Sequence, residues 1–211
     1  MAGKRNAEEE RERVLKMKQF DAKHGNTGCV AGVDEAGRGP LAGPVFAAAV
    51  ILPDDIIIKG INDSKKLSEK KREKLFDEIC EAAEAYAVFW VDEKRIDEIN
   101  ILQATFEAMR GAVSGLSKTP SYVLVDGNQN PGLSIPNETV VKGDSKSMAI
   151  AAASILAKVS RDRYITNISA EYPEYGFEKH KGYGTKAHYE AIEKYGICPI
   201  HRKTFLRKLI K

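Results

Sequence analysis

The chain has 211 residues, of which 43% are hydrophobic and 30% charged, with a formal net charge of +3. This length suffices for one large domain with its own core, or for a domain with an appendage. No apolar stretch approaches the roughly 20 residues of a membrane span, and the charged first 18 residues lack the apolar segment of a signal peptide. We therefore expect a cytoplasmic protein that does not engage a membrane.

Apolar and charged residues alternate along the chain in patterns typical of both helices and strands. We expect helices at residues 8–20, 68–85, 96–116 (interrupted near Gly111 and Gly115), 145–163, 186–195 and 204–210. We expect strands at residues 29–34, 45–52, 86–91, 122–125 and 138–141. The loop between the first two strands is rich in glycine and proline, which favours an antiparallel connection.

This order of elements predicts an α/β fold, with a central mixed β-sheet flanked by helices and a small C-terminal helical region. We divide the chain into an N-terminal helical extension at 1–25, a catalytic domain at 26–170 and a basic, substrate-binding helical region at 171–211. The three cysteines are scattered, which argues against a disulfide framework and against a zinc site.

The segment Ala31 to Pro44 reads AGVDEAGRGPLAGP and places two adjacent carboxylates at the end of an apolar run. Asp34 and Glu35 would repel each other there unless a cation sits beside them. The glycines around Arg38 let the backbone approach a ligand closely. An ordinary solvated turn could explain the acids, but it explains the glycine and proline framing of the arginine poorly.

Two further acids follow predicted strands. Asp126 ends a strand as Asp34 does, and Asp144 precedes the alanine-rich helix. Taken singly, Asp126 could be part of a turn and Asp144 a helix N-cap. Taken with the first pair, four acids converging on one place are the better interpretation. Such a set suits two divalent ions, Mg²⁺ or Mn²⁺, which could activate a water and stabilise a leaving oxygen.

Positive charge is concentrated at the end of the chain. Residues 179–211 contain nine Lys or Arg and two acids. A basic region on a nearly neutral protein indicates a polyanionic partner, although a solvated surface would also explain it.

Several segments resemble the motifs of ribonuclease HII, the type 2 ribonuclease H. They are GVDEAGRGPLAGPV at 32–45, DSKKL at 63–67, VDGN at 125–128, KGD at 142–144, AASILAKVSRD at 152–162, HKGYGT at 180–185, and His201-Arg202 followed by Phe205. The resemblance implies a ribonuclease H-like fold. It also implies an endonuclease that cuts the RNA strand of RNA–DNA hybrids and nicks duplex DNA 5′ of single ribonucleotides, leaving 3′-hydroxyl and 5′-phosphate ends.

The resemblance also assigns roles to residues. Asp34, Glu35, Asp126 and Asp144 match the metal-binding catalytic acids. The loop that senses the ribose 2′-hydroxyl matches Gly37, Arg38 and Gly39, and the tyrosine that stacks on the neighbouring sugar matches Tyr183. Contacts to the nucleic-acid backbone are expected from Ser64, Lys65, Lys146, Lys181 and Arg202, although each of these cations could also be a solvated surface residue.

Two other classes of function stay open at this point. One is another two-metal nuclease on the same fold, such as a junction-resolving or hybrid-only enzyme, which would not sense a lone 2′-hydroxyl. The other is a catalytically silent nucleic-acid-binding protein, in which clustered acids would repel phosphate. We expect the protein to be a monomer; a sliding-clamp partner is not inferable from the sequence.

Overall fold

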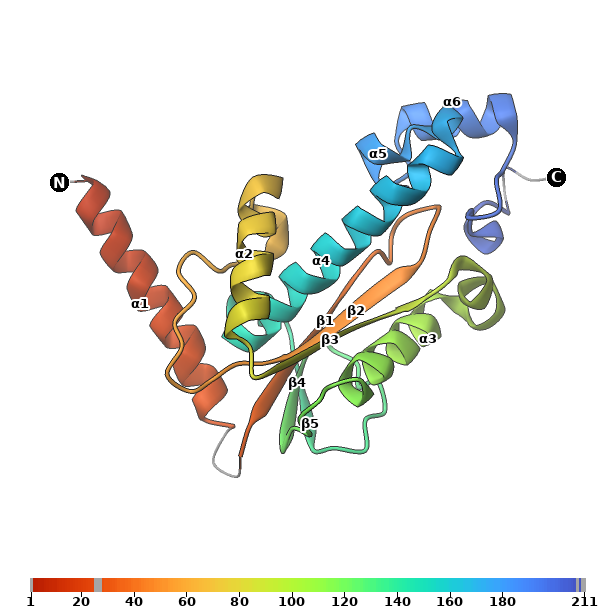
Figure 1. Cartoon of the computed structure of the whole chain (residues 1–211). Helices are drawn as coiled ribbons and strands as arrows, with labels where there is room; N and C mark the ends of the chain where they lie inside the picture. Colours follow the sequence, from red (N-terminus) through yellow and green to blue (C-terminus); the bar gives the residue numbers. More distant parts are fainter. Residues whose placement is uncertain (1, 25–27, 208, 210–211) are drawn as a thin grey trace.

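A twisted five-stranded sheet forms the centre of the protein (Figure 1). The computed structural model describes residues 2–24, 28–207 and 209. The sheet order is β3-β2-β1-β4-β5, with strands β1 (Val30–Ala36), β2 (Val45–Ile51), β3 (Ala85–Val91), β4 (Tyr122–Asp126) and β5 (Asn137–Val140). The helices are α1 (Ala2–Ala22), α2 (Glu69–Ala82), α3 (Glu93–Ser114), α4 (Met148–Ile168), α5 (Phe177–His180) and α6 (Lys186–Tyr195).

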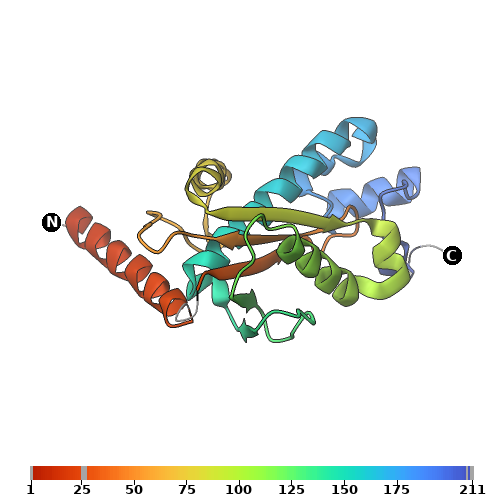
Figure 2. The same ribbon diagram turned by 60° about the horizontal axis from the view of Figure 1, so that its bottom comes forward.

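The sheet is mixed, as the sequence predicted. Strand β1 pairs antiparallel with β2 and parallel with β4, so the expected antiparallel connection through the Gly/Pro loop is confirmed. Helix α4 lies across one face of the sheet and α3 covers the other, with α2 beside α4 (Figures 1 and 2). None of the helices in the described residues combines the length and apolarity needed to cross a bilayer.

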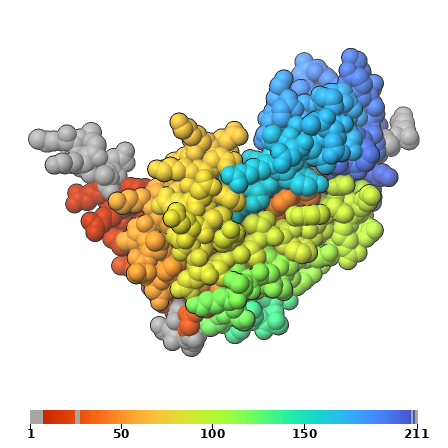
Figure 3. Space-filling view, viewed as in Figure 1, coloured from red at the N-terminus to blue at the C-terminus, as the bar shows by residue number. Residues whose placement is uncertain are grey.

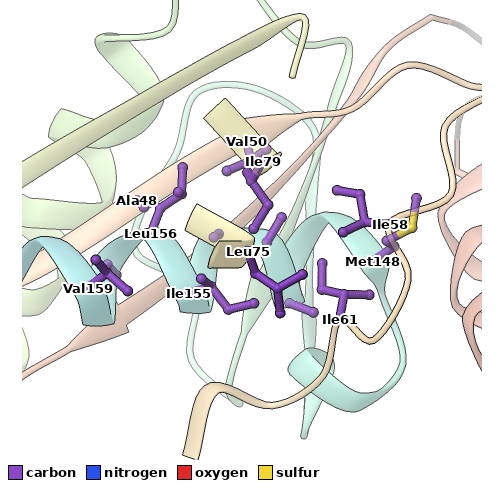
Figure 4. Close-up of a cluster of buried hydrophobic side chains, with 14 of the residues drawn as sticks. Ala48, Val50, Ile58, Ile61, Leu75, Ile79, Met148, Ile155, Leu156 and Val159 are labelled. Atoms are coloured by element: carbon purple, nitrogen blue, oxygen red, sulfur yellow. The ribbon is translucent and has the colours of Figure 1, made fainter. Parts of the chain in front are cut away.

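Helix α4 approaches β1 very closely because small residues line the contact. A Cβ on Gly32 would lie 2.1 Å from the backbone of Ala149, so any larger residue in β1 would push the helix away. Farther along the interface, apolar side chains from β2, α2 and α4 fill the space in the cluster of Figure 4. They include Ala48, Val50, Leu75, Ile79, Ile155, Leu156 and Val159.

Helices α5 and α6 pack at the C-terminal end of α4, away from α2. A separate apolar cluster holds them there, formed by Ile165 of α4, Phe177 of α5, Ile192 of α6 and Leu41 of the β1–β2 loop. The loop that carries the Gly-Arg-Gly segment is thereby part of the C-terminal core. In the space-filling view the surface is indented between α2 and the C-terminal helices (Figure 3).

Two predicted helices differ from the structure. Helix α3 is broken at Asn100 (φ 67°), not near Gly111, because the Asn100 side chain accepts from the N–H groups of Leu102 and Gln103 and restarts the helix. Gly111 instead lies inside the helix, where it makes room for the ring of Phe89. At 204–210, the described residues contain a 3₁₀ turn at Lys203–Phe205 in place of a helix; residues 208 and 210 lie outside the description.

The N-terminal helix is anchored on the body of the protein by its last turns. Val14 and Met17 are buried, and the Lys18 ammonium donates to the carbonyl of Ile56 at 3.0 Å. Asp21 accepts from the N–H groups of Met148 and Ala149 at 2.9 and 3.0 Å, and so caps the N-terminus of α4. Helix α1 therefore stabilises the end of α4 that follows Asp144.

Replacing Asp21 by Ala should lower the free energy of unfolding by about 1 kcal/mol, since two helix N–H groups lose their acceptor. Thermal unfolding followed by circular dichroism measures this change. The exposed Glu9 on the same helix provides the control, and Glu9→Ala should leave the melting temperature unchanged. Equal effects of the two substitutions would contradict the capping role.

Candidate functional site

The register of β1 and β4 brings two of the predicted acids together. Val33 is paired with Val125 in the parallel ladder, so Asp34 and Asp126 are the next residues at the same level of neighbouring strands. Side chains at the same level of a ladder share a face of the sheet, which is the face toward α4 for these two acids. Glu35 follows Asp34 and points to the opposite, α3 face.

Asp144 reaches the same place through a turn that Asp126 holds. The Asp126 carboxylate accepts from the N–H of Gly143 at 2.6 Å, at the start of the 3₁₀ turn Gly143–Ser145. A Cβ on Gly143 would lie 2.5 Å from Cδ1 of Ile150 and 3.1 Å from the Asp126 carboxylate, so a larger residue would force these side chains to shift. Asp144 does not cap α4, as the alternative interpretation held; Ser147 does, by accepting from the N–H of Ile150.

The acids repel one another in the metal-free protein. Burial, then the charges of Glu35 and Asp126, raise the pKa of Asp34 well above its ordinary value. Burial also raises the pKa of Glu35. The pKa of Asp144 rises to about 6 through burial, then through the charge of Asp63. A divalent ion among these carboxylates would remove the repulsion.

The donor set fits magnesium or manganese. The contributing atoms are carboxylate oxygens, which hard divalent ions prefer. Within the described residues, no group of three or more His, Cys, Asp or Glu side chains closes around a single point. The arrangement therefore suits ions that take one or two carboxylates each and complete their shells with water and substrate oxygens. Ions bound there would polarise a phosphate oxygen and lower the pKa of a bound water.

The Gly-Arg-Gly loop begins directly after these acids. Gly37 has φ of 96°, a conformation that strongly favours glycine. The Arg38 guanidinium lies 3.4 Å from the Glu35 carboxylate and is half exposed. A cavity of about 330 Å³ opens beside the acids, lined by Glu35, Arg38, Asp126, Asn128 and residues of α3.

Tyr183 faces this loop from the C-terminal region. A Cβ on Gly39 would lie 3.6 Å from the Tyr183 ring, so the ring and the loop are neighbours. The ring is exposed over 42% of its surface, and Lys158 and Arg161 lie within 6 Å of its centre at 5.8 and 5.9 Å. An exposed aromatic face beside the loop and the Lys158 ammonium suits a sugar–phosphate ligand.

Two buried histidines hold the Tyr183 turn from behind. His188 Nδ1 donates to the Tyr183 carbonyl at 3.0 Å, and its Nε2 lies 3.0 Å from Nε2 of His201. His201 Nδ1 in turn accepts from the N–H of Cys198 at 2.9 Å. In the tautomer in which His201 Nδ1 accepts from Cys198, both rings are neutral and His201 Nε2 donates to His188. Burial, then the neighbouring His188, lower the pKa of His201 to about 4.

The predicted backbone contacts fall into different environments. Lys65 and Lys146 are exposed, and Lys181 donates to the Thr166 hydroxyl and the Glu178 carbonyl. Ser64 is buried and accepts from the Ser154 hydroxyl at 2.7 Å, so its side chain does not face solvent. In the 63–67 segment, Lys65 and Lys66 are therefore the residues whose side chains are exposed to solvent.

The phosphate contact expected from Arg202 needs correction. A direct contact requires an exposed guanidinium, whereas Arg202 is 0% exposed. Its three nitrogens donate to the carbonyls of Gly37, Arg38 and Gly43 at 2.6, 3.0 and 2.8 Å. Arg202 therefore contacts the loop from inside the protein.

Two residues of this site were missed in the sequence. Asp63 lies beside Asp144, and only its place in the 63–67 motif could have indicated this. Arg161 is fully buried under the Gly-Arg-Gly loop. It falls on the helical face of Ala157 and Ile165, four residues to either side, which marks a buried position.

A sequence profile described as Ribonuclease HII matches residues 31–208. The chain belongs to the ribonuclease HII family. Ribonuclease HII of Caldicellulosiruptor saccharolyticus is 61% identical over 182 residues, covering 86% of this chain and 89% of that protein. Ribonuclease HII of Ruminiclostridium cellulolyticum is 53% identical over 210 residues, covering 99% of this chain and 82% of that protein.

Solved structures agree. The ribonuclease H2 of Pyrococcus horikoshii superposes with a TM-score of 0.69 at 33% identity, covering 83% of this chain and 93% of that one. The ribonuclease HII of Archaeoglobus fulgidus, solved in complex with PCNA, gives a TM-score of 0.65 at 27% identity, covering 82% and 93%. The fold expected from the sequence is thus confirmed as ribonuclease H-like. As a ribonuclease HII, the protein is a metal-dependent endonuclease that acts on RNA–DNA hybrids.

Replacing Asp34 by Asn should raise the melting temperature of the metal-free protein by roughly 2–4 °C, because it removes one charge from a buried, mutually repelling group. The amide can still accept from the Glu35 N–H, as the carboxylate does at 2.6 Å. The same substitution should weaken the stabilisation by Mg²⁺, measured as the shift in melting temperature on titration. A lower melting temperature without metal would contradict the repulsion.

The histidine pair predicts a pH dependence of stability. The pKa of His201 in the folded protein lies below its ordinary value of 6.5. The stabilising contribution of the neutral His201 ring to the free energy of unfolding is therefore complete above pH 6.5, and it is lost as the pH falls toward 4, because the unfolded chain takes up the proton first. His201→Gln retains a donor toward His188 but cannot take up a proton. Melting temperatures of this variant should therefore fall less between pH 7 and pH 5 than those of the native protein; parallel curves would refute the assignment.

Proposed function

We propose that this ribonuclease HII nicks duplex DNA on the 5′ side of single embedded ribonucleotides, in addition to cutting the RNA strand of RNA–DNA hybrids. The proposal rests on one observation: the Gly-Arg-Gly loop follows the acids directly along the chain. Glu35 and Gly37 are only two residues apart, at the end of β1. A phosphodiester bound at the acids would therefore lie next to the sugar that the loop contacts.

We assign the chemistry to two divalent ions, Mg²⁺ or Mn²⁺, held by Asp34, Glu35, Asp126 and Asp144. The proximity and mutual repulsion of these carboxylates support the assignment. Two ions about 4 Å apart suit an in-line displacement in which water attacks the phosphorus and the 3′-oxygen leaves, so that the P–O3′ bond breaks and 3′-hydroxyl and 5′-phosphate ends result. Protein side chains then position the substrate.

Recognition of the ribonucleotide falls to the loop and Tyr183. Gly37, Arg38 and Gly39 would contact the 2′-hydroxyl, which is the group that distinguishes RNA from DNA at a given position. Tyr183 would stack on the adjacent sugar, and its place against Gly39 supports this role. Lys65, Lys146 and Lys181 would supply phosphate contacts that add affinity without sequence preference.

We infer that the cellular role of the protein is that of a repair nuclease. The protein would act in the cytoplasm as a monomer, excising ribonucleotides from DNA. A purely binding protein would have no use for acids that repel phosphate, and a junction-resolving enzyme would have no use for a glycine loop beside a sugar-facing tyrosine. A hybrid-only enzyme differs in one respect, since it would ignore a lone ribonucleotide.

The decisive assay uses a labelled DNA duplex with one ribonucleotide, incubated with the protein and Mg²⁺. We expect a single nick 5′ of the ribonucleotide. An all-DNA duplex of the same sequence should remain intact, and a long hybrid should be cut in its RNA strand. Nicking of the all-DNA duplex, or cleavage of the long hybrid alone, would refute the proposal.

The Asp126→Asn variant is the matched control for metal chemistry. It should retain duplex binding but lose roughly 100-fold or more in incision rate, because a metal ligand supplies several kcal/mol of transition-state stabilisation. Tight binding without cleavage by the native protein under every metal tested would favour the binding function instead.

A further inference from the structure

Two arginine side chains are buried beneath the Gly-Arg-Gly loop without a carboxylate partner. Arg161 and Arg202 are both 0% exposed, and no ion pair of either is found among the described residues. Burying an unpaired cation is costly unless dipoles surround it. Burial lowers the pKa of Arg202 to about 9, which reflects this cost. The burial of two such costly cations indicates that their position has a role in the structure or the function of the protein.

Among the described residues, the hydrogen bonds of the two guanidinium groups all go to backbone carbonyls. Arg202 donates to Gly37, Arg38 and Gly43. Arg161 donates to the carbonyls of Pro44, Ala42 and Lys181 at 3.1, 3.2 and 3.1 Å. Five of these six carbonyls belong to the 37–44 loop, and the sixth belongs to the turn that carries Tyr183.

The direction of these carbonyls fixes the direction of the loop N–H groups. A peptide unit is planar and trans, so its C=O and N–H point to opposite sides. Since the carbonyls of Gly37 and Arg38 point inward to Arg202, the N–H groups of Arg38 and Gly39 must point outward. In the part of the chain that the structure describes, neither N–H donates to a protein acceptor.

Arg161 supports the loop from beneath Gly37 and also contacts the turn that carries Tyr183. A Cβ on Gly37 would lie 2.1 Å from Arg161 Nε, so the glycine rests directly on the guanidinium. The bond to the Lys181 carbonyl ties that guanidinium to the Tyr183 turn, and the Leu41 N–H donates to the Gly182 carbonyl at 2.8 Å. Loop and turn therefore share one buried support.

We propose that Arg202 and Arg161 are positioning residues for ribonucleotide recognition: they draw the loop carbonyls inward and so present the N–H groups of Arg38 and Gly39, beside Tyr183, to the ribose 2′-oxygen. The inference rests on the proposed function for its ligand. The orientation of the two N–H groups, which point outward because a buried guanidinium holds their carbonyls, does not depend on any enzymatic activity.

The first test uses nuclear magnetic resonance of the native, metal-free protein. The Arg202 Hε should exchange slowly with solvent, whereas the amides of Arg38 and Gly39 should exchange fast. In the Asp34→Asn protein with Mg²⁺, a duplex with one ribonucleotide should shift these two amides more than the matched 2′-deoxy duplex does. A fast-exchanging Arg202 Hε or protected loop amides would overturn the positioning.

The second test compares Arg202→Lys with Lys59→Ala, which removes an exposed cation beside α1. Lysine keeps the charge but cannot direct three fixed donors. We expect incision of the ribonucleotide duplex to fall about 10- to 100-fold in kcat, with duplex binding within twofold, because a misplaced loop mispositions the scissile bond. Lys59→Ala should behave as the native protein. A loss of rate that only matches the unfolded fraction would refute the positioning role.

Arg161→Lys is the second variant, should Arg202→Lys fail to fold. It should also narrow the ratio of incision rates between the ribonucleotide duplex and a duplex with a 2′-fluoro nucleotide at the same position. An unchanged ratio in a folded variant would overturn the inference. If the native protein fails to incise the ribonucleotide duplex, the proposed function fails, while the exchange data still decide the positioning.

Discussion

The structure depends on two buried cations that are solvated by backbone carbonyl dipoles instead of being paired with carboxylates. Arg161 comes from the central helix α4 and Arg202 from the end of the chain, and both converge on the loop after β1. Their six bonds join the sheet, α4 and the C-terminal helices into one body. Removing one guanidinium would leave up to three carbonyls buried without partners, which is why these positions matter more than their distance from the acids suggests.

Around these two arginines, the site consists of two halves that are governed by different interactions. Asp34, Glu35, Asp126 and Asp144 form a repelling group that a metal ion would stabilise. The Gly37–Gly39 loop and Tyr183 form the second half, in which the buried guanidinium of Arg202 sets the direction of the exposed peptide groups. Charge controls the first half and peptide orientation the second, so substitutions in each should have separable effects on chemistry and on selectivity.

The N-terminal helix belongs to the same scheme at the other end of α4. Asp21 caps the helix just after the turn of Asp144, although burial raises the pKa of Asp21 to about 6. Helix α4 is thus fixed at its N-terminus near the acids and at Arg161 near the sugar loop. Helix α4 therefore lies beside both halves of the site, whose spacing follows from the succession of Glu35 and Gly37 at the end of β1.

The sequence by itself determined the mixed sheet, and it predicted that the four acids converge and that the glycine loop lies beside them, because strand periodicity, acids at strand ends and dense glycines are local signals. It misplaced the break in α3, since an Asn100 side chain that restarts a helix looks like any polar residue in a helical pattern. It also placed Arg202 on phosphate and overlooked Arg161 and Asp63. Only the tertiary structure decided those roles: an arginine exposed to phosphate and one buried among carbonyls have the same side chain, and burial depends on which distant segments pack around it.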